Sequence, residues 1–136
     1  LSPIDLDLAL IALNRLVAGA VGLPEENAEF LSVLRYAPGQ LYRPHNDCIP
    51  AGADFDRSGQ RIRTALLYLS DDYEGGETHF LSSDLKFRGK TGDLLVFSNV
   101  DAAGEPDPAS KHAGIAVTSG EKWLASKWFR NKKFLY

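Results

Sequence analysis

The sequence predicts a mainly β domain with one flanking helix, folded as a sandwich or a barrel. Apolar residues recur at the three- and four-residue spacings of a helix only in the first part of the chain. From Pro24 onward, short apolar segments alternate with Gly, Pro, Asp and Asn, a pattern typical of strands and turns. One helix followed by many strands indicates a sandwich or barrel. The length of 136 residues fits a single domain, 1–136, with one core.

Residues 1–24 are expected to form the supporting helix. Ser2 and Pro3 predict its start, because a Ser side chain caps free N–H groups and Pro suits the first helical position. Gly22 and Pro24 predict its end. Its apolar face would consist of Leu6, Leu10, Leu13, Leu16, Val17 and Ala20. Since the sequence opens with Leu1 rather than Met, we expect a domain truncated at its N-terminus.

The rest of the chain is expected to form seven strands, within a core of residues 30–130. The predicted strands are 30–36, 41–47, 62–70, 77–81, 92–98, 112–118 and 122–130. Two long loops, 48–60 and 99–111, separate some of them. Loops of this length in a compact domain are commonly functional, so we expect both to border a site.

Composition excludes several classes of function. The net charge of −3 argues against a broad nucleic-acid surface, which needs a concentrated positive face. Four basic residues near the C-terminus are expected at a solvated edge instead: Lys127, Arg130, Lys132 and Lys133. No apolar run is long enough to cross a bilayer, so no membrane partner is expected. The single cysteine, Cys48, cannot form an internal disulfide, which favours a reducing compartment such as the cytoplasm.

A metal site is indicated by His45 and Asp47, because residues two apart in a strand point to the same face. Two histidines and one carboxylate leave coordination positions open, as in non-haem iron(II) oxygenases. The missing ligand would be His79 or His112. His112 has the better context, since it opens a strand, a turn and a second strand. That arrangement would place Lys122 on the neighbouring strand, where it could pair with a carboxylate of a cosubstrate.

Five blocks of sequence, in order between residues 31 and 130, resemble the prolyl 4-hydroxylase type of 2-oxoglutarate/iron(II)-dependent dioxygenases. The blocks are LRYAPGQLYRPHND, GQRIRTALLYLSD, GGETHF, GDLLVFSN and HAGIAVTSGEKWLASKWFR. The resemblance implies a double-stranded β-helix, or jelly roll, as the catalytic core. It also implies Fe(II), 2-oxoglutarate and O₂ as cofactor and cosubstrates, and a requirement for ascorbate.

The same resemblance assigns roles to individual residues. His45, Asp47 and His112 match the iron ligands, and Lys122 matches the cation that pairs with the C5 carboxylate of 2-oxoglutarate. Tyr36 and Thr78 match positions that help to hold this cosubstrate. Thr64 and Tyr68 could contribute as well, although core packing explains them equally. Residues that face the substrate in peptide-hydroxylating relatives are matched by Tyr42, Arg61 and Trp128.

The implied enzyme is an oxidoreductase that hydroxylates a C–H bond and converts 2-oxoglutarate to succinate and CO₂. The resemblance favours a peptidyl proline, and thus a peptide or protein partner. A free amino acid or another small metabolite is an alternative substrate. A non-catalytic module that binds metal or 2-oxoglutarate is a second alternative, which the intact set of ligands disfavours. A zinc hydrolase with the same three ligands is a third, in which Lys122 would lack a role.

Overall fold

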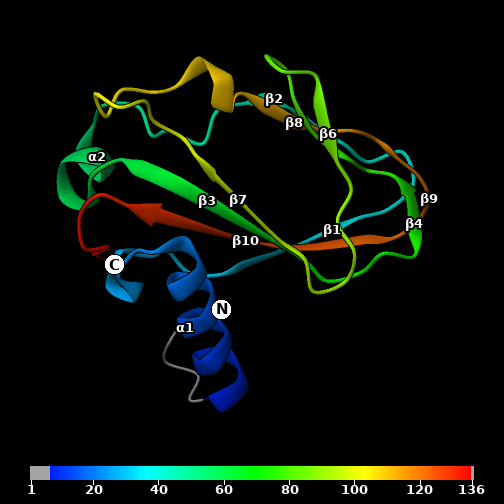
Figure 1. Ribbon diagram of the computed structural model, residues 1–136, viewed down its shortest axis with the longest axis horizontal. Helices are drawn as coiled ribbons and strands as arrows, with labels where there is room; N and C mark the ends of the chain where they lie inside the picture. Colours follow the sequence, from blue (N-terminus) through cyan, green and yellow to red (C-terminus); the bar gives the residue numbers. More distant parts are fainter. Residues whose placement is uncertain (1–6, 136) are drawn as a thin grey trace.

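The computed structural model describes residues 7–135, which form two four-stranded antiparallel sheets packed face to face. One sheet has the strand order β1-β10-β3-β7, and the other has the order β2-β8-β5-β6. Strands β4 and β9 form a separate two-stranded sheet at one end (Figure 1). Helix α1 lies on the side of the first sheet that faces away from the second (Figure 1). The predicted mainly β fold with a flanking helix, a jelly roll, is confirmed.

The strands are short, and all their pairings are antiparallel. Their bounds are β1 (Ser32–Tyr36), β2 (Tyr42–His45), β3 (Arg61–Tyr68), β4 (Tyr73–Gly75), β5 (Thr78–Phe80), β6 (Leu85–Phe87), β7 (Leu94–Ser98), β8 (His112–Gly114), β9 (Val117–Gly120) and β10 (Lys122–Arg130). The helices are α1 (Leu8–Val21) and α2 (Ala53–Ser58), with 3₁₀ turns η1 (Glu25–Asn27) and η2 (Pro108–Ser110).

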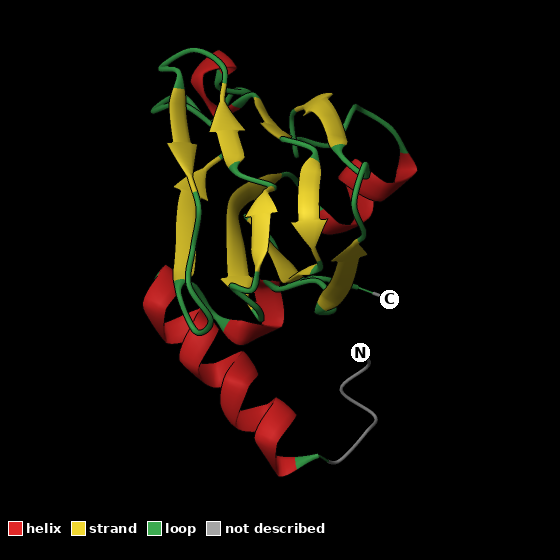
Figure 2. Ribbon diagram, turned by 90° about the vertical axis from the view of Figure 1, so that its right-hand side faces the viewer, coloured by secondary structure: helices red, strands yellow, loops and turns green. Residues whose placement is uncertain are grey.

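Helix α1 begins at Leu8, where the carboxylate of Asp7 accepts hydrogen bonds from the N–H groups of Ala9 and Leu10 at 2.8 and 3.4 Å. The start predicted at Ser2 and Pro3 lies outside the described residues. The predicted stop is confirmed, because Gly22 adopts a left-handed conformation with φ of 74° that ends the helix. The end of α1 near Leu8 points away from the strands (Figure 2).

The other half of α1 packs on the outer face of the sheet. Its residues Val17, Ala18 and Val21 form one buried cluster with Ala65 of β3 and Phe129 of β10. Burial of a Phe side chain such as Phe129 stabilises a fold, and its truncation to Ala typically costs about 3–5 kcal/mol. Among residues 7–135, no helix is long and apolar enough to span a membrane.

The two-residue period of strand β10 sorts its side chains between two environments. Lys122, Leu124, Ser126 and Trp128 point between the two sheets and line a cavity there. The alternate residue Phe129 packs under α1. The sequence of one strand therefore supplies both the support for the helix and one wall of the cavity.

Three parts of the fold differ from the prediction. Strands β4 and β6 were not predicted, and the predicted strand 112–118 is divided into β8 and β9, which pair with different partners. Helix α2 forms inside the predicted loop 48–60.

The expected solvated edge of basic residues was wrong for Lys127 and Arg130, which are 5% and 2% exposed. Nζ of Lys127 donates to Asn14 Oδ1 at 2.9 Å and to the carbonyl of Glu29 at 3.0 Å, so it joins α1 to the sheet. Arg130 forms ion pairs with Glu29 and Asp54. Both cations are buried because the fold gives them polar partners.

Candidate metal centre and adjoining cavity

Three candidate ligands meet at one end of the cavity between the sheets. His45 ends strand β2, Asp47 follows two residues later, and His112 opens β8. The pairing of β2 with β8 places His45 opposite His112. One ligand atom from each of the three residues lies within 4.8 Å of the others. Of the two histidines considered for the third ligand, the structure thus brings His112 to the site.

His79 lies on the neighbouring strand β5 but outside this cluster. In the register of β5 with β8, Phe80 lies opposite His112 and His79 lies opposite Ala113. Adjacent residues of a strand point to opposite faces, so His79 faces away from the metal site. Its Nε2 is bonded instead to Asp84 Oδ1 at 2.7 Å.

Backbone carbonyls orient both imidazole rings of the metal site. His45 Nδ1 donates to the carbonyl of Arg43 at 2.8 Å, and His112 Nδ1 donates to the carbonyl of Ser110 at 2.9 Å. With Nδ1 engaged, Nε2 of each ring points toward Asp47, at 3.4 Å from Oδ1 for His45 and 3.9 Å from Oδ2 for His112. Metal-binding histidines are commonly held in this way, so the donor set fits a divalent metal ion.

Charges in the site suit metal binding. Burial would raise the pKa of Asp47, but hydrogen bonds from His45 and Thr64 outweigh it and hold that pKa below its usual range. Burial lowers the pKa of His112, which favours the neutral ring. Burial also opposes protonation of His45, but the adjacent Asp47 carboxylate dominates and raises the pKa of that ring. A bound cation would displace the His45 proton.

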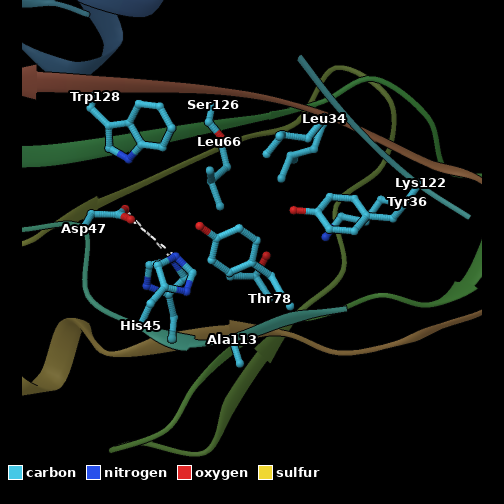
Figure 3. A pocket seen from close by; sticks show the side chains of 14 residues that line it. Leu34, Tyr36, His45, Asp47, Leu66, Thr78, Ala113, Lys122, Ser126 and Trp128 are labelled. Carbon is cyan, nitrogen blue, oxygen red and sulfur yellow. Dashed lines mark ion pairs between the residues drawn. The ribbon is translucent and has the colours of Figure 1, made fainter. Parts of the chain in front are cut away.

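The cavity beside the triad has a volume of about 110 Å³. His45 and Asp47 lie at one end of it, and Tyr36 and Lys122 lie at the other (Figure 3). Thr78 also lines the cavity, and its Oγ1 is 2.8 Å from the hydroxyl of Tyr68. The residues predicted to bind metal and those predicted to hold 2-oxoglutarate therefore share one cavity.

Lys122 is a buried cation, 3% exposed, that has no carboxylate partner among residues 7–135. Its Nζ donates to the carbonyl of Gly76 at 2.6 Å and lies 5.5 Å from the ring centres of both Tyr36 and Tyr68. Burial lowers its pKa to about 8, although Glu77 acts in the opposite direction. Burial of an unpaired charge is costly, which indicates that the site is built for an anion.

The predicted strand 122–130 matches β10, but the neighbour that we expected for it was wrong. We expected this residue on the strand next to β8, but β10 belongs to the opposite sheet. Lys122 therefore reaches the cavity from the wall that faces the metal ligands, rather than from beside them.

Residues predicted to face the substrate lie near the metal end. Tyr42 is 46% exposed, and its ring centre is 4.0 Å from that of His45. Trp128 lines the cavity, and its buried Nε1 has no hydrogen-bond partner within residues 7–135. Arg61 is not among the lining residues. Its guanidinium stacks on Trp128 at 4.3 Å and donates two hydrogen bonds to Glu29, each of 2.6 Å.

Several residues that shape the site were not singled out by the sequence. Asn99 donates to Thr64, which in turn donates to Asp47. Gly76, within the GGETHF block, supplies the carbonyl that binds Lys122, and Glu29 holds Arg61. Gly76 lies in the GGETHF block and Asn99 ends the GDLLVFSN block, so both had a signal in the sequence, whereas nothing in the sequence pointed to Glu29.

Residues 31–130 match the model of the 2OG-Fe(II) oxygenase superfamily, and the chain belongs to this family. Its members use Fe(II), 2-oxoglutarate and O₂, which the His-Asp-His site and the cavity accommodate. The expected family and cofactors are confirmed.

Among curated relatives, the chain is 40% identical over 134 residues to prolyl 4-hydroxylase 1 of Arabidopsis thaliana, covering 89% of the chain and 47% of the relative. It is 41% identical over 133 residues to prolyl 4-hydroxylase 2 of the same plant, covering 82% and 44%. The chain thus spans about half the length of these relatives.

Among solved structures, the fold is similar to viral collagen prolyl hydroxylase from Paramecium bursaria Chlorella virus 1 in complex with 2OG. The TM-score is 0.68 at 36% identity, covering 79% of this chain and 61% of the viral one. A prolyl-4-hydroxylase of Pseudomonas putida is similar with a TM-score of 0.59 at 26% identity, covering 93% and 66%.

Proposed function

We propose that the protein hydroxylates proline residues in peptides or proteins and converts 2-oxoglutarate to succinate and CO₂ in the same reaction. The observation that carries the proposal is the two-ended cavity. It has a His-Asp-His triad at one end and the buried, unpaired cation Lys122 at the other. A dicarboxylate with a 2-oxo group has one end suited to a metal ion and another suited to a cation. The catalytic core would be residues 30–130.

Each residue of the cavity has a defined task in this proposal. His45, Asp47 and His112 would hold Fe(II), which, when bound, supplies the redox chemistry that activates O₂. Lys122 would pair with the remote carboxylate, with hydroxyl donors from Tyr36 and Thr78. Leu34, Leu66 and Leu124 form apolar walls that exclude water from the bound cosubstrate.

The substrate side supports a peptide over a small metabolite. Tyr42 is exposed beside His45, and the unpartnered Nε1–H of Trp128 is available to a carbonyl oxygen. Arg61 would contribute through its stacking on Trp128. The similar plant and viral proteins bear the names of prolyl hydroxylases, one of them a collagen prolyl hydroxylase. A reducing location such as the cytoplasm and a requirement for ascorbate are part of the proposal.

Succinate formation tests the activity directly. Protein loaded with iron in the absence of oxygen is mixed with 2-oxoglutarate, O₂ and a proline-rich peptide, and the peptide is analysed by mass spectrometry. We expect one added oxygen atom per modified proline, matched by one succinate. A peptide in which alanine replaces proline is the substrate control.

Two variants separate the metal site from the rest of the fold. His112→Ala should abolish succinate formation, because it removes a metal ligand. His79→Ala should retain it, because His79 faces away from the site. Succinate formation without hydroxylation of the peptide would support oxygenase activity but reject a peptide as the substrate. If iron-loaded protein binds 2-oxoglutarate but forms no succinate, the proposal that the protein is an enzyme would be rejected.

A further inference from the structure

We propose that Thr64 and Asn99 are positioning residues that fix the Asp47 carboxylate so that a single oxygen is free to bind the metal ion. This inference rests on the proposed function, because it assumes that His45, Asp47 and His112 hold a metal ion. It concerns two buried side chains that do not line the cavity.

The three side chains form a buried hydrogen-bond relay from Asn99 to Asp47. Asn99 Nδ2 donates to Thr64 Oγ1 at 2.8 Å, and Thr64 Oγ1 donates to Asp47 Oδ2 at 2.6 Å. Thr64 and Asn99 are fully buried, and Asp47 is 6% exposed. They come from strand β3 and from the segments that follow β7 and β2. The relay thus connects β3 and the segment after β7 to the Asp47 carboxylate, which lies in the segment after β2.

Chemistry fixes the direction of these hydrogen bonds. An ionised carboxylate only accepts, so the hydroxyl of Thr64 must use its one proton on Asp47. The Thr64 oxygen can then only accept, which directs the NH₂ group of Asn99 toward it. The amide oxygen of Asn99 is left buried without a partner within residues 7–135. An unsatisfied buried acceptor lowers stability, so an apolar side chain would suit this position better if packing were its only task.

The hydrogen bond from Thr64 to Oδ2 fixes the rotation of the Asp47 carboxylate and directs Oδ1 toward Nε2 of His45, where a bound metal ion would take the place of the ring proton. Oδ2 of Asp47 is engaged, whereas Oδ1 lies 3.4 Å from Nε2 of His45. When Asp47 supplies one oxygen, the triad leaves three positions of an octahedral ion open. The cosubstrates of the proposed reaction would need these positions. If Asp47 bound through both oxygens, one of these positions would be lost.

The backbone of Asn99 is itself held by the segments that carry the ligands. Its carbonyl accepts hydrogen bonds from Cys48 Sγ at 3.2 Å and from the N–H of Asp107 at 2.9 Å. It also accepts from Ser110 Oγ at 3.5 Å, and the carbonyl of Ser110 binds the ring of His112. The backbone of Asn99 is therefore held between the segment that carries Asp47 and the segment that carries His112, and this fixes the position from which its side-chain amide extends.

Binding of Co(II) to the apoprotein, followed by calorimetry and by the visible spectrum of the bound ion, tests the relay without turnover. Thr64→Val keeps the side-chain shape but removes the donor. We expect it to weaken Co(II) affinity about 10-fold or more and to change the spectrum, since the carboxylate can then turn. Thr64→Ser keeps the hydroxyl and should restore both. Wild-type affinity and spectrum in Thr64→Val would overturn the relay.

Asn99→Leu separates positioning from packing. If Asn99 acts through Thr64, this variant should bind Co(II) more weakly while melting at the same or a higher temperature. It should add no further loss of affinity in the Thr64→Val background, because both changes break the same relay. A lower melting temperature with unchanged affinity, or additive losses, would overturn the proposal. If Thr64→Val does not fold, Asn99→Leu alone decides between these outcomes.

Wild-type protein distinguishes failure of the relay from failure of the proposed function. Wild type that does not bind Co(II) would overturn the metal centre itself, and the relay with it. Wild type that binds Co(II), with binding lost in His112→Ala and unchanged in Thr64→Val and Asn99→Leu, would overturn only the relay.

Discussion

Nζ of Lys122 lies 2.6 Å from the carbonyl oxygen of Gly76, and this neutral partner replaces the carboxylate that a buried lysine usually requires. The side chain is 3% exposed, and burial lowers its pKa to about 8, with Glu77 acting in the opposite direction. The protein thus keeps a cation in its cavity that ordinary changes of pH can neutralise.

Affinity for 2-oxoglutarate should fall as the pH rises above about 8, because the neutral amine of Lys122 cannot pair with a carboxylate. Above this pKa the dissociation constant should increase up to about tenfold per pH unit. Tyr36 and Tyr68 flank the amine, but burial raises the pKa of both, that of Tyr68 to about 12, so neither titrates in this range. Calorimetric titration of Mn(II)-loaded protein with 2-oxoglutarate, from about pH 7 to about pH 9.5, measures this dissociation constant below and above the pKa of Lys122.

Lys122→Arg is the matched control for the pH experiment, since a guanidinium stays charged throughout this range. We expect the affinity of this variant for 2-oxoglutarate to stay constant across this pH range, because residue 122 keeps its charge. An equal decline with pH in both proteins would assign the titration to another group.

Lys122→Met should stabilise the protein without ligand while abolishing 2-oxoglutarate binding. A pKa lowered from 10.5 to about 8 corresponds to an upper limit of roughly 3 kcal/mol of destabilisation. Because the folded pKa lies below the unfolded one, this cost is fully present below pH 8 and disappears as the pH rises toward 10.5. Loss of the bond to Gly76 offsets about 1 kcal/mol. Urea unfolding should therefore show a gain at pH 7 that shrinks at higher pH; a loss of stability at pH 7 would contradict this account.

Gly76→Ala should weaken 2-oxoglutarate binding as well as stability. Gly76 has φ of 69°, and a Cβ there would lie 3.1 Å from both Tyr73 and Val117 and 3.3 Å from Lys122 Cδ. The left-handed backbone alone costs about 1–2 kcal/mol in a residue with a Cβ. Gly92→Ala is the control, because Gly92 has φ of 92° and open space around its Cβ position. Both variants should lose stability, and only Gly76→Ala should lose affinity.

Arg130 should anchor helix α2 to the core. It binds Asp54 Oδ2 at 2.9 Å and the carbonyl of Gly59 at 3.1 Å, at the two ends of the helix. Arg130→Met should speed tryptic cleavage after Arg57 and destabilise the fold by about 3 kcal/mol or more, since a buried ion pair is broken.

Asp54→Asn is the companion variant, because it removes only the half-exposed partner of that ion pair. It should speed the same cleavage with a loss of stability below about 1 kcal/mol. Cleavage at the wild-type rate in both variants would show that α2 is held by other contacts.

The elements that the sequence predicted were those with a strong local pattern. The segment 122–130, rich in Leu and aromatic residues, indicated β10, and the spacing of His45 and Asp47 indicated half of the metal site. Strands β4 and β6 have three residues each and directly follow Asp72 and Asp84, so no apolar segment marked them. Strand β5 is equally short, but it lies in the GGETHF block. The division between β8 and β9 falls in an unbroken apolar run. It exists because the N–H of Ile115 and the carbonyl of Ala116 bond to Glu77 and Gly76.

The local sequence pattern could not predict contacts between segments that lie far apart in the chain. Lys122 was assigned to a strand beside β8 because the two follow each other in the chain, whereas the jelly roll sends β10 to the opposite sheet. Thr64 points inward from β3, as core residues do, so the sequence could not show whether it only packs in the core or also donates a hydrogen bond to Asp47. The roles of Tyr42, Arg61 and Trp128 toward a substrate stay predictions.

The opposed placement of the metal ligands and Lys122 has a consequence for ligand size. His45 and His112 belong to the sheet β2-β8-β5-β6, and Lys122 belongs to the sheet β1-β10-β3-β7. A dicarboxylate held at both ends would bridge the two layers, so a chain one methylene shorter or longer would lose contact at one end or strain the sandwich. On the proposed function, the spacing of the two sheets would therefore limit the length of dicarboxylate that the cavity accepts.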